Sequence, residues 1–426
     1  NVTVENVTFG DGARLEVNTP GRFTLKNCTF NGKTEVRTPV TLNVGSATVT
    51  GNTFNGTKED GTPSYYNAIE FAVSSGNKLS SATLSNNIFE AAIKNNYFST
   101  YYYADNAVIT AENNVIKLAN RGSNAIRISN VTNSNVTFNL NNNSYEFSDA
   151  SGSSEYEGFI ILQDFTKKSG NTEDFSKVTI NISNLTSPSD ASRLFYVWED
   201  SVGLVSDNNP VIKGDSSIEK FFTAKVGDTY YKTLADAVAA AQDGDTITLL
   251  KDAELTSTLN LAKNITIDGQ GKYTIKAANS FTVGSDNKTY CVLYVSGEVT
   301  LKDVTVNGNE KCRVIFCDKG KLTIDGATIT NGKAPNFIGG VYMTSSASFE
   351  MKSGSITGNK NAKGYQNDEY LQYSSDLWIG ANANGALTAI NGGTIGNVFV
   401  NANAWSASNP GSFTMNGGTV TNLYVE

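Results

Sequence analysis

Charged side chains that could act on a glycosidic bond recur at equivalent positions of a repeated segment. Asp268, Lys302, Asp325 and Lys352 each follow the second apolar residue of four aligned copies. If the copies stack as neighbouring strands at about 4.8 Å, the carboxyl groups of Asp268 and Asp325 lie about 9.6 Å apart, which suits an inverting glycoside hydrolase. Lys302 would stand between them, and alternating charges favour ion pairing along the column instead. We therefore expect a structural column and retain Asp268 and Asp325 as the catalytic candidates.

Aromatic and acidic residues gather in two segments that interrupt the repeats. Exposed aromatic faces beside polar groups are typical of sugar-binding sites, and long insertions often carry function. We therefore predict ligand binding there, with packing of the rings onto the strands as the alternative. The residues concerned are Tyr365, Asp368, Glu369, Tyr370, Tyr373, Asp376 and Trp378 after Asn359, and Trp405 further on, and a second tyrosine group is Tyr65, Tyr66, Tyr101, Tyr102 and Tyr103.

The sequence offers few of the residues that usually bind a metal ion or a cofactor. Histidine is absent, and the four cysteines, Cys28, Cys291, Cys312 and Cys317, form no CxxC motif, so we expect no zinc site. No cluster of Asp residues suits calcium, and we expect no metal and no cofactor. We expect isolated buried thiols and leave open a disulfide among the last three cysteines.

The positions of these residues follow from a repeat in the second half of the chain. The pattern is apolar, any residue, apolar, polar, small, two of any kind, apolar, as in 299–306, 322–329, 349–356 and 413–420; residues 265–269 begin an earlier copy, and 387–395 fits with one extra residue that we interpret as a bulge. Within a copy the apolar period is two, and the intervals between copies vary. Constant short strands joined by variable loops predict a solenoid of stacked parallel strands.

Asparagine marks a related repeat in the first half. Asn6, Asn27, Asn86, Asn113, Asn142 and Asn184 occupy one column of the alignment, with Gly51 in the same column. Asparagine tolerates the left-handed conformation of a tight corner, and stacked asparagine side chains can bond from one strand to the next. We interpret the column as a structural corner, with a ligand-binding asparagine row as the alternative.

One amphipathic helix is predicted at 233–242, since Leu234, Ala237, Val238 and Ala241 recur at helical spacing. Thr233 is a suitable N-cap, and Gly244 can end the segment. A solenoid needs a lid over its first turn, and this helix suits that role. We therefore predict two β-helical domains, 1–222 and 223–426, with the segment 207–214 as the linker.

The segment 230–249, YYKTLADAVAAAQDGDTITL, followed by NITIDGQG at 264–271, resembles the N-terminal cap and early coils of the pectin-lyase-like right-handed parallel β-helix superfamily. The resemblance covers roughly residues 223–426, and within that superfamily the chain is more similar to adhesin-like bacterial surface proteins than to characterised enzymes. It implies an all-β solenoid fold. The polygalacturonase motifs Asn-Thr-Asp, Asp-Asp, Gly-His-Gly and Arg-Ile-Lys are absent, and Arg127-Ile-Ser129 matches only the first two residues of the last.

Composition narrows the function class. The net charge of −8 disfavours a phosphate backbone as partner, so we expect no nucleic acid. No run of about 20 apolar residues suggests a spanning helix. Asn1 opens inside a strand pattern, which we interpret as the position after a removed export signal. We expect a secreted or cell-surface bacterial protein, adhesin-like and non-catalytic, that binds glycans or host surfaces and meets a membrane only through an anchor outside this chain. The alternatives are a polysaccharide lyase or glycoside hydrolase, and a structural spacer.

Overall fold

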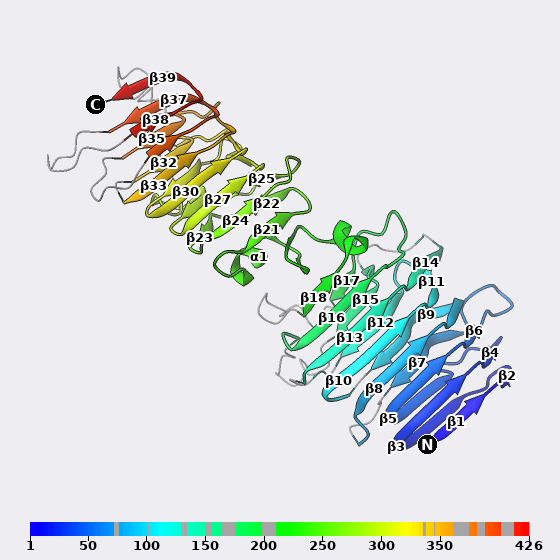
Figure 1. Cartoon of the computed structure of the whole chain (residues 1–426). Coiled ribbons are helices and arrows are strands. Elements are labelled where there is room, and N and C mark those ends of the chain that lie inside the picture. The colour runs from blue at the N-terminus through cyan, green and yellow to red at the C-terminus, as the bar shows by residue number, and fades with distance from the viewer. Residues whose placement is uncertain are drawn as a thin grey trace. The chain divides into compact units, whose positions relative to one another are not determined.

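The computed structural model describes residues 1–71, 76–100, 102–129, 131, 134–149, 151, 156–163, 175–197, 210–334, 338–344, 346–361, 375–380, 388–401 and 413–425. The described chain is all-β with large parallel sheets, and it divides into two compact units, residues 1–221 and 222–426. Within each unit the strands stack side by side in sequence order (Figure 1).

Three columns of parallel strands build the first unit. Its strands are β1 Val2–Glu5, β2 Thr8–Phe9, β3 Leu15–Lys26, β4 Thr29–Asn31, β5 Val40–Thr50, β6 Thr53–Asn55, β7 Tyr65–Phe71, β8 Leu79–Ser85, β9 Ile88–Thr100, β10 Tyr103–Glu112, β11 Val115–Asn120, β12 Asn124–Ser129, β13 Val136–Asn141, β14 Ser144–Asp149, β15 Ile160–Gln163, β16 Val178–Ser183, β17 Phe195–Val197 and β18 Val211–Gly214, followed by the 3-10 helix η5 Ser216–Phe221. One column runs β1, β3, β5, β8, β10, β13, β16, β18, the second β2, β4, β6, β9, β11, β14, and the third β5, β7, β9, β12, β15, β17.

The period of two is the reason that these strands stack in register. Leu25 pairs with Val49, and Val49 with Leu84, so apolar side chains face one interior while threonines such as Thr48 alternate outward. Phe30, Phe54 and Phe89 form a buried stack in the second column, with ring centroids 4.8 Å apart. Such pairs add about 0.5–1.5 kcal/mol each beyond the apolar area they bury.

The asparagine corner is confirmed by the backbone. Asn6, Asn27, Asn86, Asn113, Asn142 and Asn184 all have φ between 51° and 57°, and Gly51 has φ 66°. The buried hydrogen-bond ladder, however, runs through the next residue of each corner. Asn52 donates its backbone N–H and its side-chain amide to Oδ1 of Asn87, and Asn87 repeats both bonds to Asn114. The ladder continues from Asn114 to Asn143, and these asparagines are at most 1% exposed.

The second unit repeats the three-column arrangement. Its strands are β19 Ala224–Val226, β20 Thr229–Tyr231, β21 Thr246–Leu249, β22 Ala253–Leu255, β23 Leu259–Leu261, β24 Ile265–Asp268, β25 Thr274–Ala277, β26 Cys291–Val295, β27 Glu298–Lys302, β28 Thr305–Asn307, β29 Arg313–Cys317, β30 Gly320–Asp325, β31 Thr328–Thr330, β32 Val341–Met343, β33 Ala347–Met351, β34 Ser355–Ile356, β35 Leu377–Ile379, β36 Thr388–Ile390, β37 Thr394–Val400, β38 Phe413–Met415 and β39 Thr419–Val425. The first column is β21, β24, β27, β30, β33, β36, β38. The other two share one sheet, as β22, β25, β28, β31, β34, β37 and as β23, β26, β29, β32, β35, β37, β39.

Two expectations about the chain path were wrong. Phe349 pairs with Thr388 and Met351 with Ile390, so the copy starts at Thr388 rather than Leu387 and needs no extra residue. The proposed linker 207–214 includes strand β18, which pairs with β16, because Ile212 is apolar and continues the buried column after Ile180. Residues 207–209 lie outside the described part of the chain.

The amphipathic helix is present as α1, Leu234–Ala240, slightly shorter than predicted. The Thr233 hydroxyl accepts the N–H of Asp236 at 3.1 Å and donates to the Asp236 carboxylate at 2.7 Å, which caps the first turn. Lys263 Nζ donates to the carbonyl oxygens of Val238, Ala239 and Ala241 at the other end. Leu234, Ala237 and Val238 join the core cluster of the unit, so the helix buries its apolar face there. The arrangement is compatible with a parallel β-helix.

Candidate functional site

The charged column lies on the outward face of strands β24, β27, β30 and β33. Lys302 Nζ is 2.8 Å from Oδ2 of Asp268, and Lys352 Nζ is 3.6 Å from Oδ2 of Asp325. Asp268 also accepts the N–H of Gln270 on its other oxygen at 2.8 Å. Each catalytic candidate is therefore held by a neighbouring ammonium group, and Asp268 already uses both carboxyl oxygens.

A shallow hollow of about 290 Å³ lies on the same face. Its polar lining includes the outward threonines Thr266 and Thr300 and the ion pair of Lys321 with Glu350, which are 2.6 Å apart. Thr266, Thr300 and Thr323 are register partners on successive strands, so their hydroxyls follow the strand spacing. Hydroxyl, amide and charged groups in one row can exchange hydrogen bonds with a polyhydroxylated ligand.

Of the ligand-binding candidates after Asn359, the structure describes Asp376 and Trp378. Trp378 lies on β35, half-buried, while Tyr365, Asp368, Tyr370, Tyr373 and Trp405 lie outside the described residues, as does Glu369. Trp378 stacks on Phe399 with ring centroids 4.2 Å apart and meets Tyr342 edge-on at 6.2 Å. It belongs to an outward aromatic ladder on the third column, formed by Tyr294, Phe316, Tyr342, Trp378, Phe399 and Tyr424. Stacking covers the face of Trp378 toward Phe399, which leaves less of the ring for a sugar.

A buried cation lies beneath this ladder. The Arg313 guanidinium is 5.7 Å from the ring centre of Phe316 and 5.0 Å from that of Tyr342, and Nε donates to the carbonyl oxygen of Ile338 at 3.1 Å. Arg313 is 2% exposed, and burial lowers the pKa of its guanidinium. Cation–π contacts and hydrogen bonds offset the desolvation. The rings of this ladder therefore pack on the strands and on one another, which was the alternative to ligand binding for the aromatic residues.

Asp376 is the one acid of the predicted insertion after Asn359 that the structure describes. Its carboxylate is 3% exposed and accepts the N–H and side-chain amide of Asn359 at 3.1 and 2.9 Å and the N–H of Asn397 at 2.9 Å. These bonds repeat the geometry of the asparagine ladder, with an aspartate as acceptor. Burial raises the pKa of Asp376, and the hydrogen bonds from Asn359 and Asn397 oppose that shift.

We expect Asp376→Asn to change how stability depends on pH. A carboxyl group with a raised folded pKa binds more protons folded than unfolded, so its contribution to the free energy of unfolding falls as pH rises from the ordinary value of 3.8 through the folded pKa. Urea midpoints across this range should show wild type gaining stability relative to Asp376→Asn as pH falls. Asp325→Asn, at a half-buried position outside this cluster, is the control. A wild-type advantage that grows with rising pH would contradict the assignment.

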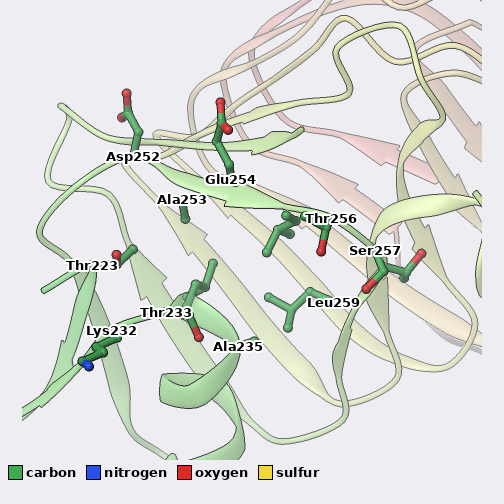
Figure 2. A pocket seen from close by; sticks show the side chains of 13 residues that line it. Thr223, Lys232, Thr233, Ala235, Asp252, Ala253, Glu254, Thr256, Ser257 and Leu259 are labelled. Atoms are coloured by element: carbon green, nitrogen blue, oxygen red, sulfur yellow. The ribbon is translucent and has the colours of Figure 1, made fainter. Parts of the chain in front are cut away.

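A second hollow of about 350 Å³ lies beside helix α1, between Thr233 and the segment 252–259. Figure 2 shows Asp252 and Glu254 directed to the side away from Thr233 and Ala235. Oδ1 of Asp252 accepts the N–H of Thr274 at 2.8 Å. Apart from Lys232, the remaining lining groups are hydroxyls and apolar side chains.

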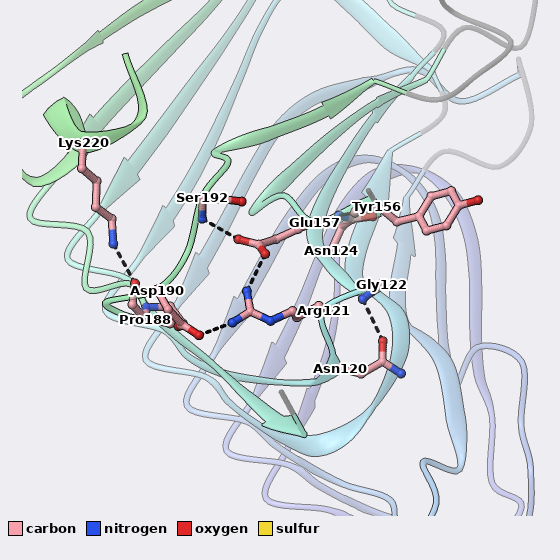
Figure 3. A network of polar contacts seen from close by, with 10 residues as sticks. All are labelled: Asn120, Arg121, Gly122, Asn124, Tyr156, Glu157, Pro188, Asp190, Ser192 and Lys220. Carbon is pink, nitrogen blue, oxygen red and sulfur yellow. Dashed lines mark hydrogen bonds and ion pairs between the residues drawn. The ribbon is translucent and has the colours of Figure 1, made fainter. Parts of the chain in front are cut away.

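An acid–base network in the first unit was missed by the sequence analysis. Arg121 lies between Glu157 and Asp190, with NH1 2.6 Å from Oε2 of Glu157 and NH2 paired with Asp190 (Figure 3). Glu157 Oε1 accepts the N–H of Ser192 at 2.7 Å, and the Arg121 guanidinium lies over the Phe147 ring at 5.3 Å. Glu157 is fully buried, and its partners come from three separate segments. No short spacing in the sequence could have indicated this cluster.

The tyrosines of the first unit do not form one exposed group. Tyr65 and Tyr103 are 2% exposed, and burial raises the pKa of Tyr65 to about 12. Tyr66 and Tyr102 are half-buried, and Tyr101 lies outside the described residues. Two of the five rings thus belong to the core.

Thiol and metal chemistry find no site in the described residues. The four cysteines are free and buried, as predicted, so no disulfide joins Cys291, Cys312 and Cys317. Burial raises the pKa of each of these three thiols to about 12, which disfavours the reactive thiolate. Within the described ranges, no group of three or more Cys, Asp or Glu side chains could hold a metal ion.

No protein-family model matches the chain, and no curated protein matches it. A search of the described helices for one long and apolar enough to cross a membrane finds none.

Proposed function

We propose that each unit is a right-handed parallel β-helix and that the chain is a secreted or surface-displayed bacterial binding protein, adhesin-like and non-catalytic, whose ligand is a glycan. Strands β24, β27, β30 and β33 pair in parallel and in register, each with the strand three positions further along the chain, which supports a solenoid. The right-handed sense is proposed because parallel crossover connections are right-handed in about 98% of cases. The resemblance of residues 230–271 to the pectin-lyase-like superfamily agrees with this proposal.

The observation that carries glycan binding is the hollow on the outward face of β24, β27, β30 and β33. It offers stacked threonine hydroxyls, the side-chain amide of Asn264 and the Lys321–Glu350 pair within one surface. Its charges are balanced, so it suits neutral sugars more than a polyanion. Trp378 and the aromatic and acidic residues of the two insertions remain further contact candidates, and the host or matrix surface that bears the glycan is part of the proposal.

The absence of catalysis is supported by the state of the two candidate acids. Glycoside hydrolysis needs one carboxyl group that donates a proton and another that activates water or attacks the sugar. Asp268 and Asp325 are each paired with a lysine ammonium group. A carboxyl group that is engaged by a lysine is less available for either catalytic role.

We expect the full chain to bind at least one polysaccharide of a panel of neutral and acidic glycans while releasing no product. Binding is measured by glycan array and calorimetry, and product by reducing-end release and unsaturated-uronate absorbance. Thr300→Val removes one hydroxyl from the hollow and should weaken binding about fivefold or more, since a lost hydrogen bond of about 1 kcal/mol corresponds to that factor. Thr305→Val, an outward threonine of the other sheet, is the matched control.

Three outcomes would overturn parts of this proposal. Product that forms with wild type and disappears in Asp325→Asn would make the protein an enzyme. Binding that is equally strong in Thr300→Val and Thr305→Val would remove the hollow as the glycan site. Complete lack of binding across the panel would favour the structural spacer.

A further inference from the structure

The first unit contains a hollow of about 480 Å³ with a different chemistry. Its described lining consists of Glu35, Arg37, Tyr66, Asn67 and Arg127. Four of the five side chains carry a charge or an aromatic ring, and Tyr66 is one of the tyrosines that the sequence analysis singled out. Two guanidinium groups in one concave surface are a recognisable feature in a chain whose net charge is −8.

Pairing between successive strands brings these residues together from three segments. Val36 forms a parallel bridge with Tyr65, and the N–H of Asn67 donates to the carbonyl oxygen of Arg37 at 3.0 Å, which places Arg37 beside Tyr66 and Asn67. Arg127 lies on β12, where it pairs with Ser99 of β9, and β9 in turn pairs with β7. The hollow therefore spans neighbouring strands of the third column, and the backbone holds its walls.

The described lining of the hollow carries the guanidinium groups of Arg37 and Arg127 and the carboxylate of Glu35. The Glu35 carboxylate is 2.8 Å from Nζ of Lys58, and the hydrogen bond to Glu35 raises the pKa of that lysine, so the two charges offset each other. Asn67 is 3% exposed and donates its amide to Oε1 of Glu70 at 2.6 Å, which fixes its orientation. Arg37 is exposed and Arg127 half-buried, so both guanidinium groups border the open volume.

We propose that this hollow binds a sugar residue that carries an oxyanion, either a carboxylate or a sulfate ester. A guanidinium group presents paired N–H donors that match two oxygens of such a group, and the bonds are charge-assisted. Tyr66 supplies an apolar ring face and a hydroxyl for the sugar itself. The site is in a different unit from the hollow lined by Thr300, so either site can fail while the other remains.

The test uses the full chain with three matched monosaccharide probes: glucuronate, glucose 6-sulfate and glucose. Ligand-detected NMR titration should show that at least one of the two anions binds about tenfold or more tightly than glucose, and that added NaCl weakens this binding. Preference for glucuronate identifies the carboxylate as the recognised group, and preference for glucose 6-sulfate identifies the sulfate ester. Binding of all three probes with equal affinity would overturn the proposal.

Variants of the lining residues test whether the preference for anionic sugars arises in this hollow. Arg37→Gln and Arg127→Gln should each lose about tenfold in affinity for the preferred anion, whereas Glu35→Gln should gain affinity because it removes the negative charge of the lining. Arg14→Gln, an exposed arginine outside the hollow, is the control. Arg37 is exposed, so its variant remains informative if Arg127→Gln fails to fold. Affinity in Arg37→Gln equal to that in Arg14→Gln would overturn the proposal, and Thr300→Val should leave anion binding unchanged.

Discussion

Asn87→Ala should lower the free energy of unfolding of the first unit by about 3–5 kcal/mol, because the buried ladder loses its central member. Oδ1 of Asn87 accepts the N–H and the amide of Asn52, each at 3.0 Å, and its own amide donates to the carbonyl oxygen of Val49 at 3.0 Å and to Oδ1 of Asn114 at 3.0 Å. Alanine leaves the Asn52 donors and the Val49 carbonyl without this partner in a site that water does not reach. Urea denaturation followed by far-UV circular dichroism gives the measurement.

The neighbouring corner residue is the matched control. Asn86 is exposed, with φ 54°, and Gly51 occupies the same column with φ 66°. Asn86→Gly should therefore stay within about 1 kcal/mol of wild type, since glycine adopts this conformation freely. A loss in Asn87→Ala no larger than that in Asn86→Gly would show that the ladder adds little stability.

Glu157→Ala should lower the free energy of unfolding of the same unit by roughly 3 kcal/mol, the lower end of the range for breaking a buried ion pair. The Glu157 carboxylate is completely buried, and without it Arg121 retains Asp190 but loses the partner that lies in the interior. The N–H of Ser192 also loses its acceptor. Thermal unfolding by calorimetry should show the first unit melting at a lower temperature, with the second unit unchanged.

Asp190→Ala separates burial from charge in this network. The Asp190 side chain pairs with the same guanidinium but is 61% exposed, so its removal should change stability by less than about 1 kcal/mol. Equal losses in Glu157→Ala and Asp190→Ala would mean that the network acts through net charge rather than through the buried pair.

The sequence pattern within a few residues was sufficient to predict the strands, the asparagine corners and the cap of the helix. The alternation of apolar and polar residues in 322–329 or 349–356 dictates which side chains face inward, so the strands and their mutual register could be predicted from the aligned copies. The left-handed asparagines follow from a preference of the single residue, and the capping of α1 by Thr233 follows from a spacing of three residues. The alternation of Asp268 with Lys302 similarly predicted the ion pairs that the column contains.

Tertiary structure alone decided which polar groups meet. The alignment identified the corner asparagines but not that the buried ladder uses the following residue, because an exposed and a buried asparagine look alike in a sequence. Glu157, Arg121 and Asp190, or Arg37, Tyr66 and Arg127, are brought together by the strand stacking and by loops of variable length, which no repeat encodes. The charged column of Asp268, Lys302, Asp325 and Lys352 could be predicted from the sequence because its residues occupy the same position of each repeat. The hollow lined by Arg37 and Arg127 could not be predicted in this way, because its walls come from different strands.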